Sequence, residues 1–147
     1  MKRTDSAVKI LLSEIKNKDI LETACGTAEF SNSASDFARS VSCIDINDSK
    51  LTSFKGTNIH FQIMNAAAME YKNETFDAVF LYNALSHVVS QWEKIEKECF
   101  RVLKPNGSIY IIGTWKIDKA LMKDMFKEKA RQKGVFLIVK LEKYYIR

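Results

Sequence analysis

The sequence has few of the residues from which metal centres and disulfide frameworks are built. Its 147 residues include only two histidines and three cysteines. Two histidines are too few for a histidine-rich metal site, so no metal is expected. Cys25, Cys43 and Cys99 form no C-x-x-C pair and are odd in number, which argues against a disulfide framework or a zinc site. Small buried thiols fit a reducing compartment, and we expect the protein to be cytoplasmic.

Long hydrophobic runs are also absent. No apolar segment approaches the roughly 20 residues that span a bilayer. Ile10-Leu11-Leu12, behind the basic N-terminus, is too short for a signal-peptide core. No membrane partner is therefore expected. The net charge of +5 permits an anionic partner such as RNA, but a solvated basic surface explains it equally well. Nucleic-acid binding stays open.

Short apolar segments alternate with amphipathic ones along a chain that has no linker, internal repeat or low-complexity tract. Its length is that of one domain, residues 1–147. Strands are predicted at 19–23, 41–45, 59–63, 78–82 and 109–112. Helices are predicted at 5–16 with Asp5 or Ser6 as cap, from Thr27 or Ala28 onward, from Asn47 or Asp48 to Gly56, at 90–103, and from Asp118 to Gly134. This alternation predicts an α/β fold, a doubly wound and mostly parallel sheet with helices on both faces.

The segment from Asp19 to Phe30 reads as an apolar strand, a turn of small residues and the start of a helix. Small side chains let the backbone approach a polar ligand, and a new helix presents unpaired N–H groups to it. About twenty residues later a second strand ends in Asp45, an acid placed to accept both hydroxyls of a ribose. A helix cap is the alternative role for Asp45. Although the turn is poor in glycine, the pattern predicts a nucleoside-type cofactor.

Six short motifs, in order along residues 19–115, resemble those of class I S-adenosylmethionine-dependent methyltransferases. Residues 22–28, Glu-Thr-Ala-Cys-Gly-Thr-Ala, are similar to an acid followed by G-C-G-T-G, with Ala24 and Ala28 in two of the three glycine places. The other matches are Cys43-Ile44-Asp45-Ile46-Asn47, Met64-Asn65-Ala66, Phe76-Asp77-Ala78-Val79, Ala84-Leu85-Ser86-His87-Val88 and Arg101-Val102-Leu103-Lys104-Pro105-Asn106-Gly107.

The resemblance implies one class I methyltransferase-like domain over residues 1–147. It also implies a Rossmann-like sheet of strand order 3-2-1-4-5-7-6 whose last strand is antiparallel. Residues 135–147 offer no Gly, Pro or Asn turn between two apolar segments. We therefore expect either an abbreviated seventh strand or one long strand there.

S-adenosyl-L-methionine is the cofactor that the resemblance implies, and its contacts follow residue by residue. Glu22 would attract the ammonium of the methionine moiety, and Asp45 would bind the ribose. Asn65 and the backbone N–H of Ala66 would meet the adenine, with Ile46 as an apolar wall or, alternatively, a core residue. Ala24, Gly26 and Ala28 would line the turn.

The two alanines at this turn carry methyl groups where the family often has none. If these positions need a positive φ, alanine there strains the backbone by about 1–2 kcal/mol. Weakened cofactor binding is the expected consequence.

Asn83 and His87, just past the fourth strand, are the nearby candidates for a general base. His87 has an alternative role as a structural residue at a helix start, and Tyr82 and Trp115 are candidates for the substrate wall. The chain has Tyr82-Asn83-Ala84-Leu85 where amino-adenine methyltransferases of nucleic acids carry N/D-P-P-Y, so that chemistry is disfavoured. Only Trp115-Lys116-Ile117 separates the fifth strand from the next helix. An open site is expected, with a bulky substrate, a partner-supplied lid or a second subunit of a homodimer.

The sequence therefore predicts a methyltransferase whose acceptor, a small molecule or a macromolecule, is unidentified. A non-catalytic methyltransferase-like module that binds a partner protein is the alternative, and it would explain Ala24, Ala28 and Asn65 together. A nicotinamide-dependent oxidoreductase is disfavoured, because Glu29 occupies the third glycine place of G-x-G-x-x-G counted from Ala24.

Overall fold

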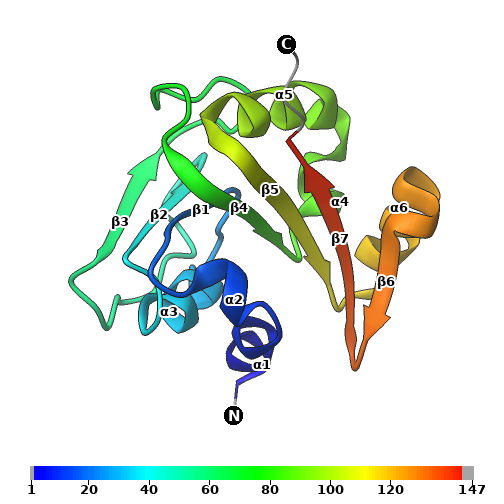
Figure 1. The fold of residues 1–147 in the computed structure, drawn as a ribbon, viewed down its shortest axis with the longest axis horizontal. Helices are drawn as coiled ribbons and strands as arrows, with labels where there is room; N and C mark the ends of the chain where they lie inside the picture. Colours follow the sequence, from blue (N-terminus) through cyan, green and yellow to red (C-terminus); the bar gives the residue numbers. More distant parts are fainter. Residues whose placement is uncertain (1, 144–147) are drawn as a thin grey trace.

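The computed structural model describes residues 2–143, and these contain a twisted sheet of seven strands with helices on both faces (Figure 1). The strand order is β3-β2-β1-β4-β5-β7-β6. β1 to β5 are parallel, and β7 runs antiparallel to both of its neighbours. The predicted fold class and strand order are confirmed. The bounds are β1 Asp19–Glu22, β2 Ser40–Asp45, β3 Ile59–Ile63, β4 Phe76–Tyr82, β5 Leu103–Gly113, β6 Ala130–Lys133 and β7 Phe136–Glu142.

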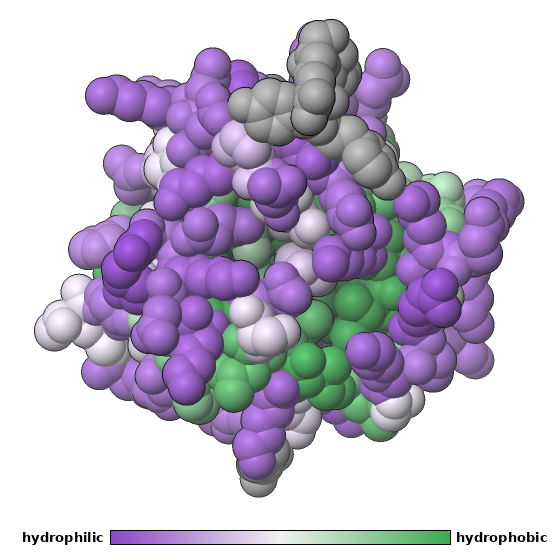
Figure 2. Space-filling view, in the orientation of Figure 1, coloured by the Kyte–Doolittle hydropathy of each residue, from purple (hydrophilic) through white to green (hydrophobic). Residues whose placement is uncertain are grey.

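Helices cover the two faces of the sheet in separate groups. α1, α2 and α3 lie on one face, and α4, α5 and α6 lie on the other (Figure 1). Figure 2 shows the face with α1 to α3 as largely hydrophilic, with a hydrophobic area over the lower parts of β5 and β7. The helix bounds are α1 Arg3–Ile10, α2 Leu12–Ile15, α3 Glu29–Ser35, α4 Leu85–Val88, α5 Trp92–Val102 and α6 Lys116–Phe126, with single 3₁₀ turns at Val89–Gln91 and Lys127–Lys129.

The core has two halves because the central strands bury both of their faces. On the α1–α3 side, the Phe80 ring packs between Phe30 and Tyr110, with ring centroids 5.1 and 5.2 Å apart. On the α5 side, Val79 and Ile111 pack against helix residues such as Cys99. The near-continuous apolar run of β4, which includes the strand predicted at 78–82, belongs to such a strand. No helix among residues 2–143 is long and apolar enough to cross a membrane.

The N-terminal helix differs from its prediction. It begins at Arg3 and breaks at Leu11 into α1 and α2. Asp5 lies inside the first turn, where its carboxylate accepts the backbone N–H of Lys2 at 3.3 Å, so it is not the N-cap residue. The observed cap, Lys2, lies three or four positions before the predicted Asp5 or Ser6, a shift too small for the apolar spacing to resolve.

The short helix predicted after Asn47 or Asp48 is wrong, since residues 46–58 form an irregular segment. The Asn47 side chain accepts hydrogen bonds from the backbone N–H and hydroxyl of Ser49, at 3.0 and 2.6 Å. Thr52 bonds with its hydroxyl to the Thr27 carbonyl at 2.7 Å. These side-chain bonds give the backbone an alternative to a helix.

The helix predicted from Asp118 to Gly134 is also wrong in its second half. α6 ends at Phe126, and residues 130–133 form β6, which pairs with β7. Gly134, with φ +58°, turns the chain between these two strands and does not end a helix. β7 is one continuous strand to Glu142, so the abbreviated alternative does not hold there. The rest of that prediction, residues 144–147, lies outside the described residues.

The turn predicted at Lys104–Gly107 is present as an irregularity within β5. The pairing with β4 jumps from Phe76↔Leu103 to Ala78↔Ser108. A Cβ on Gly107 would lie 2.9 Å from the Asp77 carbonyl oxygen, so only glycine fits this close approach of two backbones.

Candidate functional site

The predicted cofactor-binding residues gather at the carboxyl ends of β1, β2 and β3, and the two candidates for a general base follow β4. β1 lies between β2 and β4, and the chain proceeds outward from it in both directions, so the strand order reverses there. Glu22 of β1 pairs with Cys43 of β2, and Asp45 of β2 pairs with Ile63 of β3. In open α/β sheets ligands bind at such a reversal, outside the carboxyl ends of the strands.

Three residues of the turn after β1 have a left-handed backbone conformation. Ala24, Gly26 and Ala28 have φ of 51°, 55° and 63°. A hydrogen bond of 2.9 Å from the Cys25 N–H to the Ile44 carbonyl ties the turn to β2, and α3 begins directly after Ala28. The condition for strain is met, so each alanine costs about 1–2 kcal/mol relative to an unstrained backbone.

The methyl groups of these two alanines have different surroundings. Ala28 is completely buried in the core on the α3 side, whereas Ala24 is only partly buried. Of these two methyl groups, only that of Ala24 is accessible to a ligand bound at the turn.

Asp45 joins the end of β2 to the turn. One carboxylate oxygen accepts the Gly26 N–H at 2.8 Å, and the other accepts the Ile46 N–H at 2.7 Å. No helix follows Asp45, so the helix-cap alternative is wrong. A carboxylate offers about four lone-pair positions. Two remain for hydroxyl donors such as a ribose diol.

Glu22 is buried, with 2% of its surface exposed, beneath the start of α3. One oxygen accepts the Ser31 hydroxyl at 2.7 Å and the Ser31 N–H at 3.2 Å. Burial raises the pKa of Glu22 to about 8 against the opposing effect of these Ser31 hydrogen bonds. The carboxyl is therefore mostly protonated at neutral pH, and a nearby cation would favour its ionised form.

Asn65 and Ala66 follow β3 in a tight turn. The side-chain oxygen of Asn65 accepts the Ala67 N–H at 2.8 Å, and its carbonyl accepts the Ala68 N–H at 3.0 Å. Within residues 2–143 the Ala66 N–H makes no hydrogen bond, which leaves a backbone donor available at this edge.

Ile46 and Ile63 flank Asp45 with large apolar side chains open to solvent. Their exposed fractions are 72% and 59%. The core alternative for Ile46 is wrong, because a core residue would be buried. The two side chains provide an apolar surface next to the ribose-binding candidate.

The two candidates for a general base have different surroundings. The Asn83 side chain donates to the Thr114 hydroxyl and accepts from the Thr114 N–H, both at 2.8 Å, so both ends of its amide join β4 to β5. His87 is exposed on α4, and its ring meets Trp115 edge-on at 6.2 Å. Tyr82 stacks on Phe30 at 5.6 Å, half-buried at the end of β4.

Asp118 is a buried residue whose role the sequence did not reveal. It is 1% exposed, and one of its oxygens accepts the Ser86 N–H at 2.7 Å. Its other oxygen has no partner among the described residues. The sequence placed Asp118 at the start of its own helix, and it does lie in the first turn of α6; the structure adds its hydrogen bond to the first turn of α4. Nothing local in the sequence reveals the second contact, because Ser86 lies 32 residues away.

Away from this site the structure has a further cavity to consider, as well as the question of a metal site among the described residues. A cavity of about 510 Å³ lies between α5 and the end of β7, lined by residues such as Phe100, Arg101 and Leu141. No group of three or more His, Cys, Asp or Glu residues suited to a metal ion occurs within residues 2–143.

Comparison with known proteins agrees with this geometry. Residues 21–111, more than half of the chain, match the family model described as a methyltransferase domain. A ubiquinone/menaquinone biosynthesis C-methyltransferase of Rickettsia prowazekii is 28% identical over 76% of this chain and 50% of its own length. A SAM-dependent methyltransferase from Aquifex aeolicus has a similar structure, with a TM-score of 0.70 at 16% identity over 92% of this chain and 88% of its own. A SAM-dependent methyltransferase from Methanosarcina mazei has a TM-score of 0.60 at 23% identity, over 85% of this chain and 71% of its own.

The curated relatives are longer proteins. The chain spans about half the length of those it matches first. The solved structures, all less than 25% identical here, share the fold.

Proposed function

This chain belongs to the methyltransferase-domain family, and on that premise we propose that it transfers a methyl group from S-adenosylmethionine to an acceptor. The observation that carries the proposal is the arrangement at Asp45. This carboxylate ends β2, holds the left-handed turn of β1 through Gly26, and keeps lone pairs for a ribose. The proposed domain is the whole chain, residues 1–147.

The residues at this edge fit the cofactor part by part. Asp45 would bind the ribose hydroxyls. Asn65 and the unpaired Ala66 N–H would meet the adenine, against the exposed side chain of Ile46. The small residues of the turn allow close approach of the backbone, and the Glu22 carboxyl lies behind them. When bound, S-adenosylmethionine supplies a methyl group on a positively charged sulfonium.

The remaining work of the chain is to position the acceptor. In-line transfer needs a nucleophile held at the right angle and distance, and orientation of this kind can supply roughly 7–11 kcal/mol. His87 is the accessible group that could take a proton from an acceptor that carries one. Asn83 would act indirectly, by holding the ends of β4 and β5 together.

We leave the acceptor open between a small molecule and a macromolecule, and we expect an open site. Trp115 and Ile117, after β5, are 49% and 62% exposed and stand where an acceptor or a partner-supplied lid would lie. A homodimer or a partner protein could supply such a lid. The three cysteines are unpaired and buried, as a reducing compartment permits, and we propose a cytoplasmic location.

A non-catalytic module that binds a partner protein is the second candidate. The strained Ala24 at the turn and the neutral Asn65 favour it, because both would weaken contact with the cofactor. This candidate predicts no binding of S-adenosylmethionine at millimolar concentration.

Calorimetric titration with S-adenosylmethionine separates the two candidates, and Asp45→Ala tests the site. Micromolar binding is expected for the wild type. Loss of hydrogen bonds to a charged acceptor should weaken binding in Asp45→Ala by about 1.5–3 kcal/mol. Asp77→Ala is the matched control, because Asp77 accepts the Asp19 N–H at 2.8 Å near the amino end of β4, away from the proposed site. Unchanged affinity in Asp45→Ala would refute the ribose role.

A further inference from the structure

The connection from β3 to β4, residues 64–75, has neither helix nor strand, yet it carries Asn65 and Ala66. After Ala68, most of the hydrogen bonds that hold this connection are made with the end of α5. The Met69 N–H donates to Glu98 at 2.7 Å. The N–H groups of Glu74 and Thr75 donate to the carbonyls of Arg101 and Val102, at 3.0 and 2.7 Å. The path of this connection is therefore set by α5.

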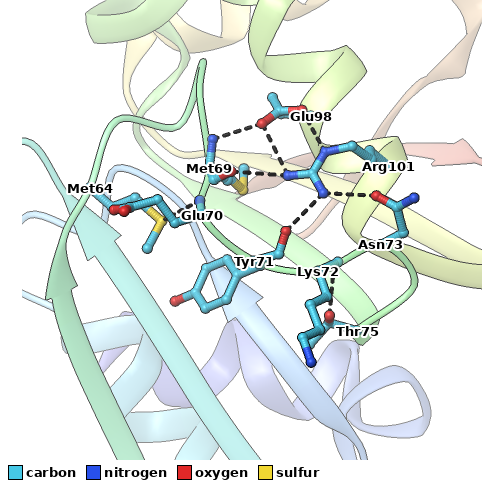
Figure 3. Close-up of polar contacts among 9 residues, drawn as sticks. All are labelled: Met64, Met69, Glu70, Tyr71, Lys72, Asn73, Thr75, Glu98 and Arg101. Carbon is cyan, nitrogen blue, oxygen red and sulfur yellow. Dashed lines mark hydrogen bonds and ion pairs between the residues drawn. The ribbon is translucent and has the colours of Figure 1, made fainter.

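Arg101 is the centre of this attachment, and all five of its guanidinium N–H groups have acceptors (Figure 3). Two of the acceptors are backbone carbonyls of the connection, those of Met69 at 3.1 Å and Tyr71 at 2.8 Å. A third is the Asn73 side chain at 2.9 Å. Lysine could not reproduce this planar set of donors.

Glu98 completes the attachment from the same helix. It pairs with Arg101 at 2.8 Å and at the same time accepts the Met69 N–H (Figure 3). Both polar backbone groups of Met69 are thus held by the Arg101–Glu98 pair. The guanidinium beside Glu98 keeps the pKa of that carboxyl below its ordinary value.

The segment between Asn65 and Met69 is short and held by its own hydrogen bonds, so the constraint on Met69 is transmitted to Asn65. The side-chain and backbone oxygens of Asn65 hold the N–H groups of Ala67 and Ala68. The Glu70 N–H reaches back to the Met64 sulfur at 3.4 Å, and both Met64 and Met69 are buried in the core on the α5 side. A shift of Met69 would therefore move the turn that presents the Ala66 N–H.

We propose that Arg101 and Glu98 are positioning residues for recognition of the adenine. They act through Met69 to hold the Asn65–Ala66 turn at the place where it meets the base. This inference rests on the proposed function. It assigns a role to the arginine of the Arg101–Gly107 motif, which lies outside the proposed contact set of the cofactor.

The test compares two ligands that differ only in the base, S-adenosylhomocysteine and S-inosylhomocysteine. The hypoxanthine ring carries a hydrogen at N1 and an oxygen at C6, so it opposes the Ala66 donor and lacks the amino group. Wild-type protein should prefer the adenine ligand by about tenfold or more in Kd, as expected for unpaired hydrogen-bonding groups. Arg101→Lys and Glu98→Gln should reduce this ratio to roughly threefold or less.

Arg39→Lys is the matched control. Arg39 makes a similar two-point contact with the Asp19 carboxylate, near the amino end of β1. The Arg39→Lys variant should keep the wild-type ratio of the two Kd values. If the variants at Arg101 and Glu98 weaken both ligands equally, the pair is merely structural and the inference is wrong. If the wild type binds neither ligand, the proposed function fails as well. Glu98→Gln keeps the test valid should Arg101→Lys not fold, which circular dichroism would reveal.

Discussion

Alanine occupies two left-handed positions at the turn after β1, and the two should respond differently to glycine. Ala24 has φ 51° and is partly buried. Relief of strain exceeds the extra entropy of the unfolded chain, so Ala24→Gly should raise the free energy of unfolding by about 0.5–1 kcal/mol. Urea denaturation measures this change.

Ala28→Gly serves as the comparison, because Ala28 has a similar φ of 63° but a fully buried methyl group. Its loss of about 0.8 kcal/mol of methyl burial offsets the relief of strain, so a near-neutral change is expected. A destabilised Ala24→Gly would show that the turn is not strained at residue 24.

Glu22 should make the stability of the protein depend on pH. Its folded-state pKa of about 8 lies above the ordinary 4.5. As pH rises through this interval, the unfolded chain releases the proton before the folded one does, so stability falls. Glu22→Gln has no such loss. The variant should therefore gain stability relative to wild type between about pH 5 and about pH 9. Parallel pH profiles in urea denaturation would contradict this expectation.

The candidate site shows what can be predicted at the scale of residues. Asp45, Asn65 and Ala66 could be placed because each follows a recognisable strand. Their hydrogen-bonding states could not, because the partners Gly26 and Ala67 are set by the turn geometry. The sequence did not distinguish a core role for Ile46 from a ligand-facing one. The folded structure does, because the Ile46 side chain is exposed to solvent.

At the scale of elements, the hairpin of β6 and β7 provides the clearest test. Gly134 has φ +58° and no atom within 4 Å of an added Cβ, so Gly134→Ala is opposed by backbone conformation alone. The expected loss is about 1–2 kcal/mol. If residues 127–134 were helical instead, alanine would stabilise them by about 1 kcal/mol. Thermal unfolding measures the sign.

Lys133→Ala is the control for this change, since Lys133 is exposed on β6 beside Gly134. An exposed substitution of this kind should stay within about 0.5 kcal/mol of wild type. If Gly134→Ala stabilised the protein, the assignment of β6 and β7 as a hairpin would be wrong.

Elements with a strong pattern were predictable, and those with a mixed pattern were not. β4 is apolar on both faces, and α5 has Trp92, Ile95, Cys99 and Val102 on one stripe. The segment at 127–134 is rich in lysine, and its strand exists because β7 lies beside it. The segment at 46–58 has apolar residues at helical spacing, yet side-chain bonds from Asn47 and Thr52 direct its backbone elsewhere.

At the scale of the whole molecule, a ligand that binds only the folded state raises its stability. S-adenosylhomocysteine at about 100 times its Kd should add about 2.7 kcal/mol. For a chain of this size that corresponds to an increase of roughly 5–10 °C in Tm. A thermal shift assay measures it. At the same ligand concentration the increase in Asp45→Ala should fall to about half of the wild-type value or less, because its binding is weaker by about 1.5–3 kcal/mol, and NAD should produce none. No shift with the wild type would favour the partner-binding module.

The residue pattern along the chain was enough to predict the architecture, which the structure confirms, and to propose the kind of ligand. Apolar strands that alternate with amphipathic helices can bury their faces only in a doubly wound sheet. An acid at the end of each of the first two strands, beside a turn of small residues, predicts a nucleoside site. Three further properties became clear only from the folded chain: which side chains are buried, the raised pKa of Glu22, and the hydrogen bonds from Arg101 to the connection that bears Asn65. These properties depend on groups distant in sequence, so no local pattern contains them.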